Sequence, residues 1–151
     1  KSGDQILNEI EFTASSTNNS HNPVCNDVSF ISLFEDDKKG FWTRNDEQSW
    51  ICLDFKDKSI CPIAYTLKSC YSQSYPKTWC IEVSNDMNSW EVIDKQKYCK
   101  DLNGKNQFKT FIINKQNLGY FRYIRIRQIE NWNSENNLGV GAFEIYGSIQ
   151  L

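Results

Sequence analysis

Short runs in which apolar and polar residues alternate occupy much of the chain, and this period of two indicates β-strands. The clearest run extends from Trp79 to Ser84, where the polar sequence Ser84-Asn85-Asp86 interrupts it. Asn and Asp hydrogen-bond to their own backbone and tolerate turn dihedral angles, so we expect the strand to end there in a tight turn. Trp90 restores the apolar pattern and begins the next predicted strand.

Other segments have the same strand-like character and are separated by turn residues. They are Ile10–Thr13, Trp50–Phe55, Ile63–Cys70, Trp90–Asp94, Phe108–Ile113, Phe121–Gln128 and Ala142–Gly147. We find no apolar stripe with helical spacing that is longer than about two turns. The pattern therefore predicts an all-β sandwich of short strands.

The predicted loops divide between the two ends of this sandwich. Each connection in an antiparallel sandwich reverses the chain, so successive loops lie at opposite ends. One end is expected to hold the loops 71–78, 95–107 and 130–141 and both ends of the segment 14–49; the other is expected to hold 56–62, 85–89 and 114–120. The first group contains the long connections, and we expect this rim of loops to carry the binding site.

Size and composition fit a single folded domain that spans residues 1–151. The 151 residues are 39% apolar and 14% aromatic, and the net charge is −2. This charge gives no electrostatic footprint for nucleic acid, and the apolar runs are too short for a membrane span. No signal peptide is visible and the chain begins at Lys1, so we expect a domain excised from a larger protein.

Six cysteines bear on the cellular compartment: Cys25, Cys52, Cys61, Cys70, Cys80 and Cys99. No C-x-x-C pair occurs, and the only histidine has no cysteine at a zinc-like spacing, so we expect no zinc site. Free, buried thiols would behave as small apolar groups and favour an intracellular, cytoplasmic protein. Disulfides would favour an extracellular one.

Aromatic and amide side chains are concentrated in the predicted rim loops. The candidate ligand-binding residues are Asn22, Tyr71, Tyr75, Trp132, Asn133, Asn136 and Asn137. Rings beside amides suit a sugar or a peptide, because a ring stacks on an apolar face and an amide both donates and accepts hydrogen bonds. However, Asn is also common in loops for backbone reasons alone.

One predicted strand carries arginine on both faces, because Arg122 alternates with Arg125 and Arg127. The pair on one face could clamp an anion, or the arginine stems could lie over apolar neighbours on an exposed face. Both faces cannot be core, so we expect one arginine to pair with an acid such as Glu82 or Glu144.

No catalytic motif is present. The chain has no G-x-S-x-G elbow, no P-loop and no H-E-x-x-H sequence, and its only histidine is His21. Cys25 follows four residues later, but this spacing in a loop indicates no nucleophile pair. We therefore expect a binding module and not an enzyme.

Several blocks of sequence point together to one family. They are Phe41-Trp42-Thr43, Trp50–Phe55, Pro76–Trp79, Ser84-Asn85-Asp86, Asp101–Gly104, Phe121–Arg127 and Ala142–Gly147. This set resembles the discoidin, or coagulation factor V/VIII type C, domain, and most closely the kind attached to BTB/kelch-type intracellular proteins. The resemblance implies a galactose-binding-like jelly roll.

The resemblance also implies a possible calcium site. Carbohydrate-binding relatives often hold calcium in the segment that matches Glu35 and Asp37, closed by the acid that matches Glu144. These carboxylates are the oxygen ligands that calcium takes. Lys38 and Lys39 follow directly and oppose a cation, so a solvated acidic turn is the alternative.

The resemblance does not identify the ligand, because proteins with this fold bind sugars, phospholipids or other proteins. Extracellular members join the two ends of the domain by a disulfide, and here no cysteine precedes Cys25 or follows Cys99. The rim is rich in Asn and lacks apolar spikes, which argues against membrane insertion. We expect recognition of a protein or peptide partner through the rim; the alternative is a lectin-like carbohydrate-binding domain of a secreted or cell-surface protein.

Overall fold

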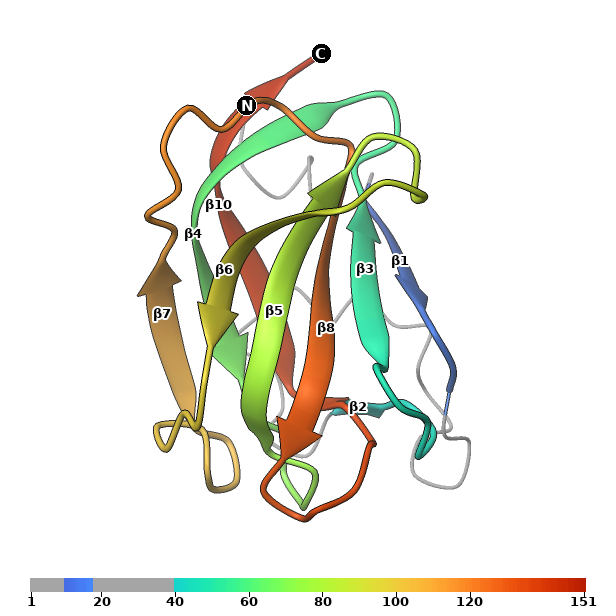
Figure 1. Cartoon of the computed structure of the whole chain (residues 1–151), viewed down its shortest axis with the longest axis vertical. Coiled ribbons are helices and arrows are strands. Elements are labelled where there is room, and N and C mark those ends of the chain that lie inside the picture. The colour runs from blue at the N-terminus through green and yellow to red at the C-terminus, as the bar shows by residue number, and fades with distance from the viewer. Residues whose placement is uncertain (1–9, 18–39) are drawn as a thin grey trace.

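Two antiparallel sheets face each other in the computed structural model, which describes residues 10–17 and 40–151 (Figure 1). One sheet has the strand order β1 (Glu11–Ala14), β3 (Trp50–Asp54), β8 (Tyr123–Asn131), β5 (Pro76–Ser84) and β6 (Glu91–Gln96). The other has the order β10 (Ala142–Gln150), β4 (Ser59–Lys68) and β7 (Phe108–Ile112), and a short ribbon pairs β2 (Phe41–Trp42) with β9 (Gly139–Val140). The predicted all-β antiparallel sandwich is confirmed.

The boundaries of the strands differ from the prediction for local reasons. The strands β2 and β9 have two residues each, too few for an alternating pattern to reveal them. Strand β5 begins at Pro76, before the predicted start, because proline is tolerated as the first residue of a strand. In the pairing of β10 with β4 the register shifts between Tyr146 and Gly147, which interrupts the period of two near the start of β4.

Aromatic side chains from both sheets form the centre of the core. Trp79, on β5, and Tyr65, on β4, are each 0% exposed, and the Tyr65 hydroxyl accepts a hydrogen bond from Trp79 Nε1 at 3.0 Å. The ring of Phe111 lies 5.0 Å from that of Tyr65 and 5.4 Å from that of Trp79. Trp50 and Trp90 are instead half-buried, and the Arg125 guanidinium lies 5.6 Å from the ring of Trp50 and 3.7 Å from that of Trp90.

The arginines of β8 are paired within the molecule. The Glu82 side chain is 7% exposed, and its Oε1 accepts hydrogen bonds from Nε of Arg125 at 2.9 Å and of Arg127 at 3.0 Å. The expected pairing of an arginine with Glu82 is therefore confirmed. Asp54 accepts two hydrogen bonds from Arg122, at 2.8 and 3.1 Å. Burial acts to raise the pKa of Asp54, but the bond from Arg122 and a backbone hydrogen bond hold it below its ordinary value.

The loops divide between the two ends of the sandwich as the reversal count predicts. The connections 43–49, 69–75, 97–107 and 132–138 lie at the lower end in Figure 1, and 55–58, 85–90 and 113–122 lie at the upper end. Length alone does not distinguish the two ends, because the upper connection 113–122 is also long. The lower group defines the loop rim.

Candidate functional site

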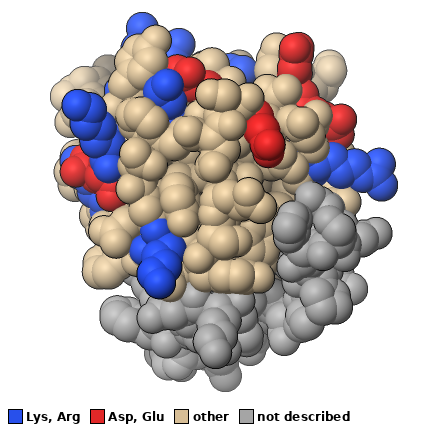
Figure 2. Space-filling model, turned by 90° about the horizontal axis from the view of Figure 1, so that it is seen from below, with Lys and Arg blue, Asp and Glu red and all other residues tan. Residues whose placement is uncertain are grey.

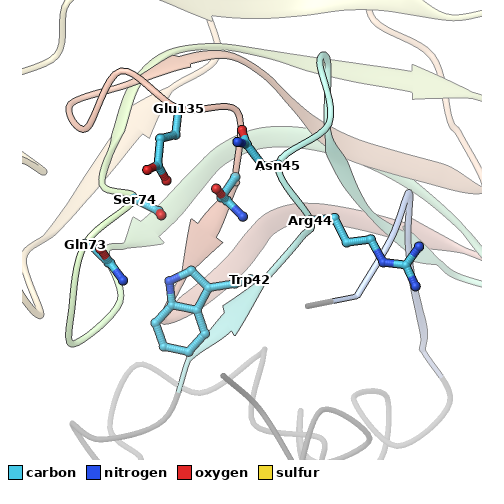
Figure 3. Close-up of a pocket in the computed structure, with 7 residues that line it drawn as sticks. Trp42, Arg44, Asn45, Gln73, Ser74 and Glu135 are labelled. Carbon is cyan, nitrogen blue, oxygen red and sulfur yellow. The ribbon is translucent and has the colours of Figure 1, made fainter. Parts of the chain in front are cut away.

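A pocket of about 390 Å³ lies in the loop rim, at the lower end of the sandwich. Its lining residues come from three segments that are far apart in the sequence: Trp42 at the end of β2 with Arg44 and Asn45 after it, Gln73 and Ser74 before β5, and Glu135 and Asn137 before β9 (Figure 3). The β2–β9 ribbon and the strand ends bring these three segments together.

The first and third segments are joined by hydrogen bonds at Thr43, a residue that is 0% exposed. The Thr43 amide donates to the Leu138 carbonyl at 3.0 Å, and the Leu138 amide donates to Thr43 Oγ1 at 2.8 Å. The side chain of Asn137 donates from Nδ2 to the Thr43 carbonyl at 2.8 Å. Since Leu138 and Asn137 are also buried, these bonds fix one wall of the pocket.

Two buried side-chain amides, those of Asn131 and Gln128, hold the 132–138 loop in place. Asn131 Oδ1 accepts the backbone amides of Asn133 at 2.9 Å and Glu135 at 3.1 Å, while its Nδ2 donates to the Asn137 carbonyl at 2.8 Å. Gln128 Nε2 donates to the same carbonyl at 2.7 Å. The Asn-rich sequence here is therefore largely structural, because the side chains replace the hydrogen bonds of a regular strand.

The second segment adopts an unusual backbone where it lines the pocket. Gln73 and Ser74 have φ angles of 31° and 59°, in the left-handed region that side chains with a Cβ disfavour. Each such residue costs on the order of 1–3 kcal/mol and persists only where its surroundings fix it. The Ser74 amide donates to Asn133 Oδ1 at 2.6 Å, which ties this segment to the 132–138 loop.

Trp42 and Cys70 pack together beneath the pocket. Trp42 is 2% exposed, and its ring lies edge-on to that of Tyr71 with centroids 5.2 Å apart. The Cys70 thiol donates to the carbonyls of Ser72 and Gln73, and burial raises its pKa to about 12, so it remains a donor. A Cβ at Gly139 would lie 2.8 Å from Trp42 Nε1 and 2.9 Å from Cys70 Sγ, so only glycine fits beside this pair.

The charged side chains of the pocket point in different directions. In Figure 3 the Glu135 carboxylate is turned toward Ser74, over the pocket, whereas the Arg44 guanidinium is turned away from it. Arg44 Nε donates to the Thr17 carbonyl at 3.3 Å. Figure 2 views this end of the molecule from below, and there the charged side chains lie mostly toward the periphery of the described surface. The described surface at this end is therefore mainly uncharged.

Of the candidate residues chosen from the sequence, only Asn137 lines the pocket. Asn133 adjoins it through Ser74, Tyr71 through Trp42, and Asn136 through its amide, which donates to Asn45 Oδ1 at 2.7 Å. Asn22 lies outside the described residues.

The two remaining candidates are engaged beside the pocket. Trp132 Nε1 donates to the Cys99 carbonyl at 3.0 Å, and its ring lies 4.8 Å from Lys77 Nζ. Tyr75 accepts the Trp132 amide at its carbonyl, at 3.0 Å. The structure therefore gives both residues a role in holding the loops.

The other lining residues were not predicted individually: Trp42, Arg44, Asn45, Gln73, Ser74 and Glu135. Gln73, Ser74 and Glu135 lie in loops that the reversal count assigns to this end. Trp42 lies in one of the sequence blocks that resemble a known family, but nothing in the local pattern places it opposite the other loops.

The described residues contain no group of three or more His, Cys, Asp or Glu side chains that could hold a metal ion. Glu35 and Asp37, two of the three possible calcium ligands, lie outside the described ranges. The third, Glu144, lies on β10 and accepts a hydrogen bond from the Tyr146 hydroxyl at 2.8 Å.

Two further observations concern the cysteines and membrane-spanning helices. Cys52, Cys61, Cys70, Cys80 and Cys99 are free thiols in the structure, and Cys25 lies outside its described part. Within residues 10–17 and 40–151, no helix is long and apolar enough to cross a membrane.

The fold is shared with carbohydrate-binding modules of known structure. A Clostridium perfringens module, CpGH89CBM32-5, in complex with GalNAc-β-1,3-galactose, has a TM-score of 0.69 and 14% identity over 94% of this chain and 98% of its own. The family 32 module of C. perfringens NanJ, in complex with galactose, has a TM-score of 0.67 and 11% identity, covering 96% of each chain. The module of AlyQ, in complex with 4,5-unsaturated mannuronic acid, has a TM-score of 0.67 and 15% identity over 91% of this chain and 95% of its own. These similarities establish a galactose-binding-like β-sandwich and, at such identities, the fold alone.

A family model described as "Sad1 / UNC-like C-terminal" matches residues 38–149. No curated protein sequence matches the chain. The galactose-binding-like architecture expected from the discoidin resemblance is confirmed, but the matching family is a different one from the discoidin domain. This domain type is a non-catalytic binding module. The chain belongs to the Sad1/UNC-like C-terminal family.

Proposed function

We propose that this domain binds a protein or peptide partner through the loop rim, with the pocket between Trp42, Ser74 and Glu135 at the centre of the contact. Domains of the Sad1/UNC-like family bind protein partners, which supports this choice over other ligands of the fold. A place within an intracellular protein, which the free thiols of the described cysteines favour, is part of the same proposal.

The observation that carries the proposal is the rigid construction of the pocket. Side-chain-to-backbone hydrogen bonds at Thr43 and Ser74 tie the three loops together, and those of Asn131 fix the 132–138 loop itself. A site fixed in advance loses little conformational entropy when a ligand binds, and so retains more of the interaction energy. The backbone strain at Gln73 and Ser74 lies in the same wall, which is where strained residues with a functional role are found.

The second candidate is a carbohydrate, because two of the similar C. perfringens modules hold galactose or GalNAc-β-1,3-galactose. A sugar needs an exposed ring on which its apolar face can stack. Among the described residues that line this pocket, the aromatic one is Trp42, and it is only 2% exposed. The remaining lining side chains are polar, so the pocket offers hydrogen bonds without a stacking platform, which favours a peptide.

The test is to screen the intact domain against a random peptide library and a glycan array, together with two matched variants. Gln73→Trp fills the pocket, while Gln116→Trp makes the same exposed substitution in the 113–122 connection at the opposite end. We expect peptide binding that Gln73→Trp weakens at least tenfold and Gln116→Trp leaves unchanged. Glycan binding that is lost in Gln73→Trp, without any peptide binding, would favour the lectin-like alternative. Peptide binding that only Gln116→Trp abolishes would place the site at the wrong end.

A further inference from the structure

The carboxylate of Glu135 is the charged group directed over the pocket. The two ionisable residues that line it are Arg44 and Glu135, and only the second is turned toward the shared space (Figure 3). Among the described residues, none makes an ion pair or a hydrogen bond with the Glu135 carboxylate, whereas its backbone amide is fixed by Asn131. A fixed backbone therefore presents an unpaired carboxylate to the pocket.

Arg44 does not neutralise this carboxylate, because it is engaged elsewhere. Its backbone amide donates to Ser16 Oγ at 2.9 Å, and its Nε donates to the Thr17 carbonyl at 3.3 Å. These contacts hold the arginine toward the segment that follows β1. The pocket consequently has a negative centre although its lining residues sum to zero charge.

The neighbouring amide side chains can both donate to and accept from a ligand. Asn137 directs one Nδ2 hydrogen to the Thr43 carbonyl, and its Oδ1 can accept a hydrogen bond from a ligand. The Ser74 hydroxyl can donate or accept. The Glu135 carboxylate, the Asn137 amide oxygen and the Ser74 hydroxyl together match a ligand that carries several N–H donors and a positive charge.

We propose that the pocket selects a basic side chain, lysine or arginine, of the peptide partner, and that Glu135 determines this specificity. This inference rests on the proposed function, since it names the partner's chemistry at the same site. An ammonium or guanidinium group donates three or five hydrogen bonds and accepts none, which complements Glu135 and Asn137. The volume of about 390 Å³ is at the small end of the range for ligand sites and has room for one long side chain.

A cationic sugar is the competing ligand of similar charge. One of the similar structures is a chitosan-binding module from Paenibacillus sp. IK-5, with 16% identity and a TM-score of 0.63. The missing ring platform favours the peptide here as well, since Trp42 is buried. Chitosan oligosaccharides therefore belong in the experiment as a separate arm.

The experiment is a positional scan of peptides on the intact chain, followed by a double-mutant cycle. We expect the bound peptides to share a lysine or arginine at one position, and its replacement by glutamine to weaken binding about tenfold. Glu135→Gln should weaken binding of the basic peptide by a similar factor and leave the glutamine peptide unaffected, because both changes remove the same ion pair. Binding of the basic peptide should also weaken as salt rises.

The matched control is Glu47→Gln, which removes the same charge from an exposed residue of the 43–49 loop that does not line the pocket. It should change binding less than twofold; an effect equal to that of Glu135→Gln would overturn the inference in favour of a general charge effect. Peptides that bind without a basic position, or binding that is insensitive to Glu135→Gln, would overturn the inference and leave the proposed function standing. Chitosan bound through Glu135 with no peptide bound would overturn both.

Discussion

The buried hydroxyl of Tyr65 offers the sharpest test of how the two sheets are joined. This hydroxyl donates to Asp94 Oδ2 at 2.5 Å and accepts from Trp79 Nε1 at 3.0 Å, and both rings are 0% exposed. Tyr65→Phe removes one oxygen atom and keeps the ring contacts with Phe111 and Phe143. The substitution therefore isolates a hydrogen-bonded link that runs from β4 to β5 and β6.

The expected cost follows from the partners that are left behind. Trp79 Nε1 would be a buried donor without an acceptor, which costs about 1–3 kcal/mol. Asp94 is half-buried and still accepts hydrogen bonds from Gln96 Nε2 at 3.1 and 3.4 Å. Losing the Tyr65 hydroxyl as a donor therefore costs less free energy at Asp94 than at Trp79. We expect Tyr65→Phe to lower the free energy of unfolding at pH 7 by about 2–3 kcal/mol. In a domain of this size that corresponds to a fall in Tm of about 5–10 °C.

The pH dependence gives a second, independent measure. Burial, together with the hydrogen bond to Asp94, raises the pKa of Tyr65 far above its ordinary value of 10. Only the unfolded chain then ionises this tyrosine near pH 10, so its stabilising contribution is complete below that pH and declines above it. The decline is about 0.1 kcal/mol at pH 9 and about 0.8 kcal/mol at pH 10.5. Tyr65→Phe lacks this titration, so the difference between the two proteins should narrow by about 0.7 kcal/mol between these pH values.

Urea unfolding, followed by tryptophan fluorescence under reducing conditions at pH 7, 9 and 10.5, measures both effects. Tyr98→Phe is the control, because its side chain is 63% exposed and should change stability by less than about 0.5 kcal/mol. A Tyr65→Phe protein as stable as the wild type at pH 7, or a difference that stays constant up to pH 10.5, would refute the assigned hydrogen bonds.

The remaining predictions concern the pocket wall and the bulge between β10 and β4. Thr43→Val should lower the free energy of unfolding by about 1–3 kcal/mol and speed hydrogen exchange of the Leu138 amide, because that buried amide loses its acceptor; unchanged exchange would contradict the assigned bond. Gly147→Ala should destabilise by about 1–3 kcal/mol, because its Cβ would lie 2.1 Å from the Cys61 carbonyl oxygen. Gly119→Ala, which meets no atom within 4 Å, should stay within about 0.5 kcal/mol of the wild type, and equal losses in both variants would disprove the steric argument.

The pairing of the β8 arginines was only partly predictable from the sequence. Alternation placed Arg125 and Arg127 on one face, and the need to neutralise a buried charge suggested an acid as partner. The structure selects Glu82 because the register of β5 with β8 sets it opposite Arg125. Cross-strand register depends on every bulge between the two segments, and two irregularities occur in this pairing near Thr78. The local sequence does not contain that information.

The pocket was only partly predictable for a related reason. Counting reversals assigned the correct loops to one end, because direction of travel is a local property of each strand and turn. Trp132 does not line the pocket, because its ring packs against Lys77 and its Nε1 bonds to the Cys99 carbonyl; its contact with a ligand stays a prediction. Glu135 and Ser74 gave no signal of their own, since a carboxylate or a hydroxyl in a loop is ordinarily solvated.

The period of two, the turn residues and the reversal of direction at each connection were sufficient to determine an all-β sandwich and the end at which the loops of the rim meet. These features follow from backbone sterics and from the burial of alternate side chains, and both act within a few residues. Only the tertiary structure decided which side chains face the pocket. Its walls come from three segments that approach one another through the β2–β9 ribbon and the bonds at Thr43, Asn131 and Ser74. Such long-range contacts depend on the packing of the whole sandwich, which no single segment specifies.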